Sequence, residues 1–268
     1  MLTTWTTVAV LQAIFLMFLA AVSRAAAREA VQPETSRKVL HTGAGLLTLV
    51  LPFVFRDLWP VALLAVMTAA ALAVIRLLPA MRMRFGAAAY RVGRSSYGEF
   101  YFLLAVVALF WLAEGQSALL FTIPVLILTL ADTAGALAGS RYGRCWYGSL
   151  HKTVEGSIAF AAIAFLCALG PLLLWTSIGR AESFLIAATL ALLVTLIEAG
   201  AWRGRDNLLI PIGSYILLRC FLPLTLGTLV ACFTAALVLV LVIVSCVVYL
   251  RMGMPWMKSS RSLPMRST

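Results

Sequence analysis

The stretch ADTAGALAGSRYGRCWYGSLHKTVEGS, residues 131–157, carries charged residues that a purely structural membrane span does not need. Asp132 follows the apolar run FTIPVLILTL, about 15 residues and roughly 22 Å into a helix that would begin near Ser117. An ionised carboxylate at that depth costs at least about 2–3 kcal/mol unless it is paired or bound to a metal. Two interpretations stay open: Asp132 pairs with a buried arginine in a helix-packing stripe, or it ligates a divalent cation.

The residues after Asp132 are rich in glycine and in basic side chains. Gly135 and Gly139 lie on the same side of the helix as Asp132, where they permit the close approach of a second helix or of a ligand. The loop that follows combines basic groups with flexible backbone, which suits a polyphosphate but is also typical of any basic loop. Its relevant residues are Arg141, Gly143, Arg144, Gly148, Lys152 and Gly156.

The segment KTVEGS, at the end of this loop, has the composition of a helix start. Thr153 is a suitable N-cap residue. Glu155, Gly156 and Ser157 would lie in or near the first turn, where exposed backbone amides attract anions. We therefore expect a helix to begin here and to offer its first turn to a phosphate group.

Two further polar groups stand where apolar runs begin. In RKVLH, residues 37–41, the pairs Arg37–His41 and Lys38–His41 share a helical face. They either set the membrane topology or contact phosphate through Arg37 or Lys38, with His41 as a proton-handling group. In RSSYGEF, Glu99 is either a helix-start acid favoured by the helix dipole or a catalytic carboxylate.

The segment EAGAWRGRDNLLIP joins two apolar runs and carries two carboxylates. Glu198 closes the first run, and Asp206 and Asn207 open the second. Asp206 and Asn207 are good N-cap residues, but together they also supply two oxygen ligands of the kind that magnesium prefers. Pro211 and Gly213 are expected to interrupt the second run, as in segments that wrap a site.

The apolar runs that must position these groups predict an all-α, polytopic membrane protein. The chain has 268 residues, of which 63% are hydrophobic and only 12% charged, and its mean hydropathy is +1.01. A helix needs roughly 20 apolar residues to cross a bilayer. We expect about 8–9 membrane spans in a single domain, residues 1–250, with a basic tail at 251–268. The nine candidate spans are 4–23, 39–55, 58–75, 98–113, 117–139, 157–178, 183–200, 208–223 and 226–250.

The distribution of basic residues predicts the orientation of these spans. With the N-terminus outside, 18 of the 21 lysines and arginines fall on the inner side, as the positive-inside rule requires. Both histidines and most polar residues fall there too, so the site is expected to face the cytoplasm and the C-terminus to be cytoplasmic. The net charge of +11 therefore indicates topology and not nucleic-acid binding. The five cysteines form no CxxC motif, and they suggest neither a disulfide framework nor a zinc site.

The polar residues of the inner face favour one reaction class. Carboxylates, an asparagine and lysine or arginine donors fit magnesium-assisted phosphoryl or nucleotidyl transfer. Signatures of a serine hydrolase or of a catalytic thiolate are missing. Because the site opens at a bilayer, the second substrate is expected to be a lipid.

Five of these segments, in this order, resemble the family of CTP-dependent lipid kinases: dolichol kinase, phytol kinase and the CTP-dependent diacylglycerol kinase. The segments are RKVLH, RSSYGEFYF, ADTAGALAGSRYG, KTVEGS and DNLLIP, within residues 37–211. The resemblance implies transfer of the terminal phosphate of CTP, or of another NTP, to the hydroxyl of a polyprenol, phytol or diacylglycerol. It implies that Asp132 binds Mg²⁺, that Lys152 and Glu155 act in the nucleotide loop, and that Asp206 and Asn207 complete the cation or nucleotide site.

Combining the residues with the resemblance gives a working hypothesis for each role. Asp132 and Asp206 would hold Mg²⁺, with Asn207 assisting. The phosphate-binding residues would be Lys152, Arg141, and Arg37 or Lys38. The attacking hydroxyl would be oriented by Glu155, Glu99 or His41, among which the sequence does not choose. The lipid alcohol, the choice of CTP over other nucleotides and the oligomeric state are left open by the sequence.

Two other functions compete with this hypothesis. Phosphatidate cytidylyltransferase is similar around the Asp132 helix and KTVEGS, but its closing Pro-Gly-His-Gly-Gly and Asp-Arg pattern is absent here, where the chain has RGRDNLLIPIGSYILL. A transporter would be expected to have paired halves with broken helices at the midplane. The sequence has no persuasive internal repeat, so a kinase is favoured over both.

Overall fold

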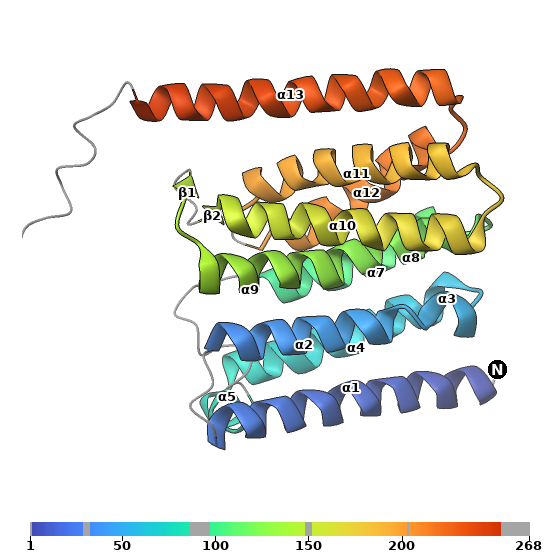
Figure 1. Cartoon of the computed structure of the whole chain (residues 1–268). Helices are drawn as coiled ribbons and strands as arrows, with labels where there is room; N and C mark the ends of the chain where they lie inside the picture. Colours follow the sequence, from blue (N-terminus) through green and yellow to red (C-terminus); the bar gives the residue numbers. More distant parts are fainter. Residues whose placement is uncertain (1, 29–32, 86–96, 148–151, 203, 253–268) are drawn as a thin grey trace, which may run out of the picture.

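The computed structural model describes residues 2–28, 33–85, 97–147, 152–202 and 204–252, and this part of the chain is a bundle of helices with one two-stranded hairpin. The long helices lie roughly side by side, with α1 and α13 on opposite flanks (Figure 1). The all-α expectation is confirmed. In chain order the elements are α1 (Leu2–Arg28), α2 (Pro33–Thr48), α3 (Leu51–Val54), α4 (Leu58–Leu77), α5 (Pro79–Phe85), α7 (Gly98–Leu112), α8 (Leu119–Leu126), the π-helix η1 (Ile127–Ala131), α9 (Asp132–Tyr142), β1 (Trp146–Tyr147), β2 (Lys152–Thr153), α10 (Val154–Trp175), α11 (Arg180–Gly200), α12 (Asp206–Phe221) and α13 (Leu226–Met252).

Six helical segments of the described part are long and apolar enough to cross a membrane, so the chain is an integral membrane protein. They are Thr3–Ala27, Leu58–Leu77, Leu119–Tyr142, Val154–Trp175, Arg180–Gly200 and Leu226–Tyr249. The expected span at 39–55 is divided into α2 and α3 by a turn at residues 49–50, and α7 and α12 have only 15 and 16 residues. The span count of 8–9 and the orientation stay predictions.

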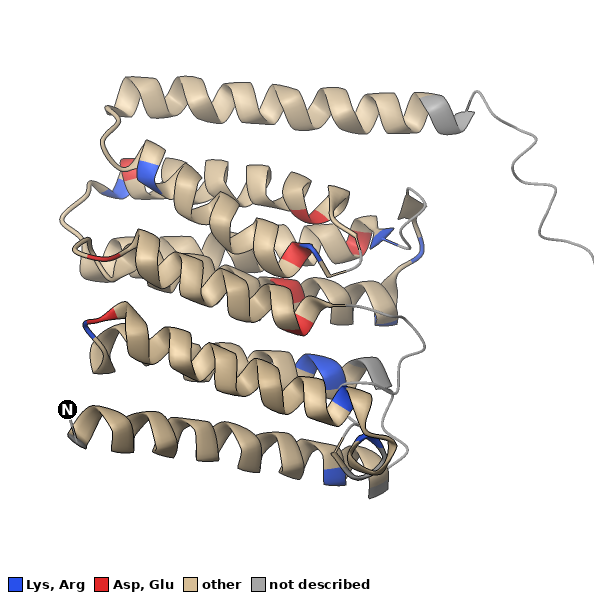
Figure 2. Cartoon of the chain, turned by 180° about the vertical axis from the view of Figure 1, so that it is seen from behind, with Lys and Arg blue, Asp and Glu red and all other residues tan. Residues whose placement is uncertain are grey.

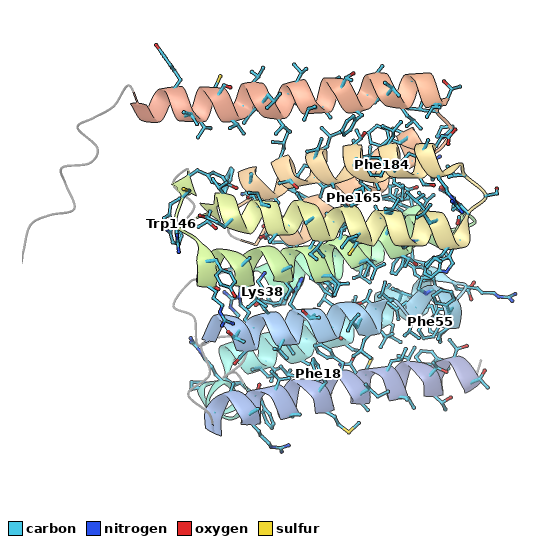
Figure 3. The ribbon with its side chains drawn as sticks, in the orientation of Figure 1. Phe18, Lys38, Phe55, Trp146, Phe165 and Phe184 are labelled. Carbon is cyan, nitrogen blue, oxygen red and sulfur yellow. The ribbon has the colours of Figure 1, made fainter. Side chains whose placement is uncertain are left out.

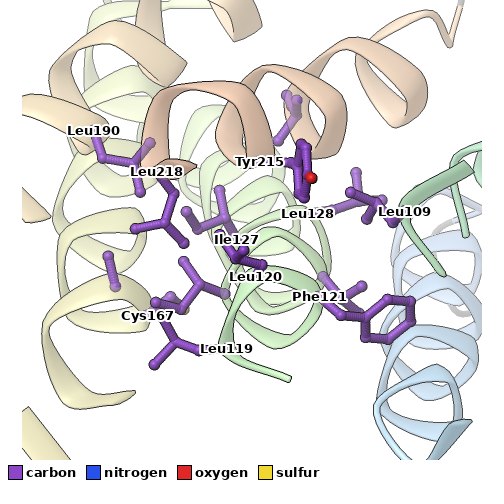
Figure 4. Close-up of a cluster of buried hydrophobic side chains, with 14 of the residues drawn as sticks. Leu109, Leu119, Leu120, Phe121, Ile127, Leu128, Cys167, Leu190, Tyr215 and Leu218 are labelled. Carbon is purple, nitrogen blue, oxygen red and sulfur yellow. The ribbon is translucent and has the colours of Figure 1, made fainter. Parts of the chain in front are cut away.

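The segment formed by α8, η1 and α9 is the centre of the bundle. Of its most apolar 18-residue window, 67% is buried, against only 6% for α13. Leu120, Phe121, Ile127 and Leu128 of this segment are almost completely buried. They pack among side chains from α7, α10, α11 and α12, such as Leu218 (Figure 4). This packing holds the helix that carries Asp132 in a fixed place.

Proline does not end the helices in which it occurs. Pro211 and Gly213 lie inside α12, which is continuous, so the expected interruption is wrong. Proline removes one backbone hydrogen bond from a helix. Here the buried packing of Pro211, beside Ile210 and Ser214, offsets that loss. α12 can therefore present Asp206 from a rigid helix start.

A short π-helix, η1, lies directly before Asp132. Such π-segments are rare and are frequently found at functional sites. The backbone carbonyl of Leu128, within η1, lies 3.1 Å from Nε2 of His41 on α2. The wider turn thus joins the central helix to α2 close to the buried carboxylate.

Glycines let α9 and α10 approach closely. A Cβ atom at Gly139 would lie 2.8 Å from Oγ1 of Thr153, and one at Gly156 would lie 2.8 Å from the carbonyl oxygen of Gly135. Of the two possibilities given by the sequence, the structure therefore shows the approach of a second helix. Thr153 itself caps α10, accepting a hydrogen bond from the Gly156 amide at 3.1 Å, which confirms the expected helix start.

We expect Gly139→Val to lower the stability of the protein by about 1–3 kcal/mol, because the added methyl groups overpack the contact between α9 and α10. Thermal unfolding in detergent would measure this change. The matched control is Gly170→Ala on α10, since a Cβ there meets no atom within 4 Å. If both variants unfolded at the wild-type temperature, the close helix contact would be irrelevant to stability.

Candidate functional site

Asp132 lies at the start of α9, where its carboxylate faces two residues of α2. Nζ of Lys38 donates a hydrogen bond to Oδ2 of Asp132 at 2.6 Å, and Nε2 of His41 lies 3.5 Å from the same oxygen. The side chains of Lys38 and Asp132 are each only 7% exposed. Figure 3 shows Lys38 between α2 and α9. The shared face of Lys38 and His41 predicted from their spacing is thus directed at Asp132.

Asp132 is therefore paired with a buried cation, as in the first of the two interpretations, but that cation is a lysine and not an arginine. Lys38 and Asp132 are 94 residues apart in the chain, so their pair fastens α2 to the central helix. A second contact next to it, between the hydroxyls of Thr42 and Thr133 at 2.9 Å, fastens the same two helices. A buried charge pair with such supporting contacts is rigid, which is a requirement for precise positioning of a ligand.

The second charged pair of the site joins Lys152 of β2 to Glu198 near the end of α11. Nζ of Lys152 donates a hydrogen bond to Oε1 of Glu198. The side chains of Lys152 and Glu198 are 21% and 11% exposed. Burial alone would lower the pKa of Lys152, but the Glu198 carboxylate outweighs it, so this pKa is raised and the ammonium stays charged at neutral pH.

The two pairs belong to one electrostatic cluster at one end of the bundle. Asp132 and Asp206 both act on the charge of Lys152, in addition to Glu198. Asp206 opens α12 and also acts electrostatically on His41. Charged residues of the described part lie mostly toward the two ends of the bundle, and its middle carries few of them (Figure 2). The cluster thus combines three carboxylates with two lysines and a histidine, which is the composition predicted for phosphate chemistry.

A β-hairpin between α9 and α10 carries Lys152 into this cluster. Trp146 pairs with Thr153 and Tyr147 with Lys152 in antiparallel register. The hydroxyl of Tyr147 lies 2.5 Å from Oγ of Ser157 on α10. Burial, above all, raises the pKa of Tyr147, so this hydroxyl remains protonated and serves as a hydrogen-bonding group.

Two predicted site residues, Glu155 and Asn207, make contacts that hold the scaffold. The carboxylate of Glu155 accepts the backbone amide of Cys145 at 3.2 and 3.3 Å, which closes the base of the hairpin. Nδ2 of Asn207 donates to the carbonyl of Gly98 at 2.8 Å and so joins α12 to the start of α7. The N-cap of α12 is Arg205, without a side-chain cap bond, so Asp206 and Asn207 are not N-cap residues.

The remaining predicted residues take no part in the two ion pairs of the cluster. Glu99 forms an ion pair with Arg76 at 3.0 Å, a contact between α7 and α4. Arg141 is exposed and stacks on the ring of Tyr142, with 5.5 Å from its guanidinium carbon to the ring centroid. Arg37 is half-buried on α2, next to Lys38.

We expect Glu99→Gln to keep lipid-directed activity within about threefold of the wild type, because its carboxylate is engaged with Arg76 and takes no part in the ion pairs of the cluster. A steady-state assay on membranes containing equal amounts of each protein would measure this. The opposite result, a loss of activity with normal folding, would indicate that Glu99 is a catalytic residue.

Glu198 was not predicted as a site residue. Its place at the end of an apolar run is evident from the sequence, but its pairing with a lysine 46 residues earlier in the chain is not. The available signal was its burial, since an acidic residue in the last turns of an apolar helix is expensive unless it has a partner. Glu198 is in fact only 8% exposed.

The carboxylates of the cluster can be compared with the ligands that Mg²⁺ requires. Within the described residues, no three His, Cys, Asp or Glu side chains gather closely enough to hold a metal by themselves. Mg²⁺, however, is usually held by one or two carboxylates together with substrate phosphates. Asp132 and Asp206, which both act electrostatically on Lys152, are suitable donors for a cation that arrives with a nucleotide.

The fold and this cluster define a polytopic, all-helical integral membrane protein with a charged site at one end of its bundle. No family model and no solved structure matches the chain. The chain is similar to the phytol kinase of Synechocystis sp., with 28% identity over 187 residues that cover 69% of this chain and 78% of that kinase. This similarity confirms the predicted resemblance to the CTP-dependent lipid kinase family.

Proposed function

We propose that this protein is a membrane lipid kinase that transfers the terminal phosphate of CTP, or of a related nucleotide, to the hydroxyl of a long-chain alcohol. The similarity to a phytol kinase supports the reaction class and makes phytol the first alcohol to test. The apolar helices support a lipid acceptor, because an alcohol in the bilayer reaches the end of the bundle without leaving the membrane. The cytoplasm is the proposed location of the site.

The observation that carries the proposal is the convergence of two lysines and three carboxylates at one end of the bundle. Lys38 and Lys152 are held in place by Asp132 and Glu198, so both ammonium groups are positioned before any substrate binds. Phosphoryl transfer requires mainly positioning and neutralisation of phosphate charge. Lys152, together with Arg141 and Arg37, would bind the phosphates.

Magnesium is the proposed cofactor. Asp132 and Asp206 would hold it, and it would neutralise the charge that develops on the phosphate oxygens. Lys38 and His41 orient the Asp132 carboxylate from α2, since both nitrogens face its Oδ2 atom. Glu155, Gly135, Gly139, Gly156 and Ser157 would contribute by keeping α9, α10 and the hairpin together around Lys152.

Purified protein in detergent, with Mg²⁺ and CTP labelled at either the γ or the α phosphate, would test the proposal. The acceptors are phytol, a polyprenol, diacylglycerol and phosphatidate, each offered separately. We expect γ label in the phosphate of one alcohol. Incorporation of α label into phosphatidate would instead indicate a cytidylyltransferase. No transfer of either label, from CTP or ATP, would contradict the proposal.

A further inference from the structure

Transfer of a phosphate to an alcohol releases the proton of the hydroxyl, so the site needs a group that can receive it. The three candidates given by the sequence are engaged elsewhere. Glu155 accepts the Cys145 amide, and Glu99 is paired with Arg76. Nε2 of His41 faces the Leu128 carbonyl, which can only accept, so this nitrogen already carries a proton, and only Nδ1 of the ring could receive one.

Glu198 differs from Glu99 and Glu155 in that its carboxylate lies within the charged cluster, where it contacts Lys152. Oε1 accepts a hydrogen bond from Lys152, whereas Oε2 is buried and has no hydrogen-bond partner among the described residues. An unpaired, buried carboxylate oxygen is costly, by about 1–3 kcal/mol or more. A buried polar atom without a partner calls for an explanation, and a catalytic role is one of those known. Of the atoms of this kind in the described residues, Oε2 is the one that belongs to a carboxylate.

The position of Glu198 also suits an acceptor from the bilayer. It lies in the last turns of α11, an apolar helix that reaches the charged end of the bundle. Lys152, the proposed phosphate ligand, contacts the same carboxylate. A hydroxyl at Oε2 and a phosphate at Lys152 would thus be neighbours, which is the arrangement that in-line transfer requires.

Resting on the proposed kinase function, we propose that Glu198 is the catalytic base, with Oε2 as the atom that receives the proton of the lipid hydroxyl. The alcohol oxygen forms a bond to the terminal phosphorus. The bond from that phosphorus to the bridging oxygen breaks, and its electron pair leaves with the nucleoside diphosphate. The proton ends on Glu198 and returns to water when the products depart. No oxidant, reductant or further reactant is needed.

The test is Glu198→Gln, which preserves the shape of the side chain and a carbonyl that accepts from Lys152 but cannot receive the proton. With the alcohol that the wild type accepts, we expect kcat to fall about 100- to 10,000-fold, the range of general base catalysis. The KM for CTP should change by less than about threefold, because Lys152 keeps its place. Glu182→Gln, at the opposite end of α11, is the matched control and should behave like the wild type.

Two outcomes would overturn the inference. One is wild-type kcat in Glu198→Gln. The other is a joint loss of nucleotide binding, measured by equilibrium dialysis, and of thermal stability, which would give Glu198 a structural role. Should Glu198→Gln fail to fold, Glu198→Asp is the second variant. It keeps the carboxylate but shortens the side chain by one methylene, which moves the carboxylate away from the substrate. We expect normal CTP binding with kcat lowered about 10- to 100-fold. If the wild type itself phosphorylates no alcohol, it is the proposed function that fails.

Discussion

Asp132→Asn is expected to abolish transfer of phosphate to the lipid, lowering kcat/KM by about 1,000-fold or more, the size of effect seen when one preorganised electrostatic group is removed. The carboxylate is the common partner of Lys38 and His41 and the proposed ligand of Mg²⁺. Asparagine keeps the shape but removes the charge. The γ-label assay measures the loss, and transfer at the wild-type rate would disprove the assignment of Asp132.

A double variant separates the catalytic role of Asp132 from its structural role. Removing one partner of a buried ion pair costs about 3–5 kcal/mol, whereas replacing both by apolar residues is often neutral or stabilising. We therefore expect Lys38→Met with Asp132→Leu to unfold at or above the wild-type temperature in detergent and still to be inactive. Activity in this stable double variant would show that the pair serves only to join α2 to α9.

Lys152→Met is expected to have the second largest effect, raising the KM for CTP at least about tenfold and lowering kcat/KM about 100- to 1,000-fold. The lysine is charged, because the influence of Glu198 outweighs its burial. The same γ-label assay at varied CTP concentration separates KM from kcat. Arg180→Gln, at the opposite end of α11, is the control and should leave both unchanged.

Exchanging the charges tests whether Lys152 acts on a ligand or only on Glu198. The variant Lys152→Glu with Glu198→Lys retains an ion pair, so most of the thermal stability lost in Lys152→Met should return. Nucleotide binding should not return, because a carboxylate then occupies the position of the proposed phosphate ligand. Recovery of both properties would mean that the pair has a purely structural function.

The local features of the site could be predicted from the sequence. Thr153 follows a loop and precedes an apolar run, so its role as a cap depends only on its neighbours in the chain. Lys38 and His41 share a face because they are three residues apart on one helix. The burial of Asp132 follows from its distance into an apolar segment. Each inference needs only the repeat of a helix.

The contacts between distant segments could not be predicted. Glu198 pairs with Lys152 only because α10 and α11 pack in a particular register, which no short pattern specifies. The turn between α2 and α3 shortens a segment that looked long enough to cross a membrane, and composition alone does not reveal it. In the sequence, Gly135 and Gly139 are compatible with the close approach of either a ligand or a second helix, and in the structure it is α10 that lies against them.

The peripheral position of α13 determines how freely different parts of the chain can diverge. A helix whose most apolar window is only 6% buried meets few constraints beyond remaining apolar, because most of its side chains have no specific neighbour in the protein. Substitutions among Val, Leu and Ile there should accumulate almost neutrally. The central segment formed by α8, η1 and α9, whose most apolar window is 67% buried, should tolerate few substitutions. Alignments of distant relatives should therefore lose α13 first and retain the segment around Asp132 longest.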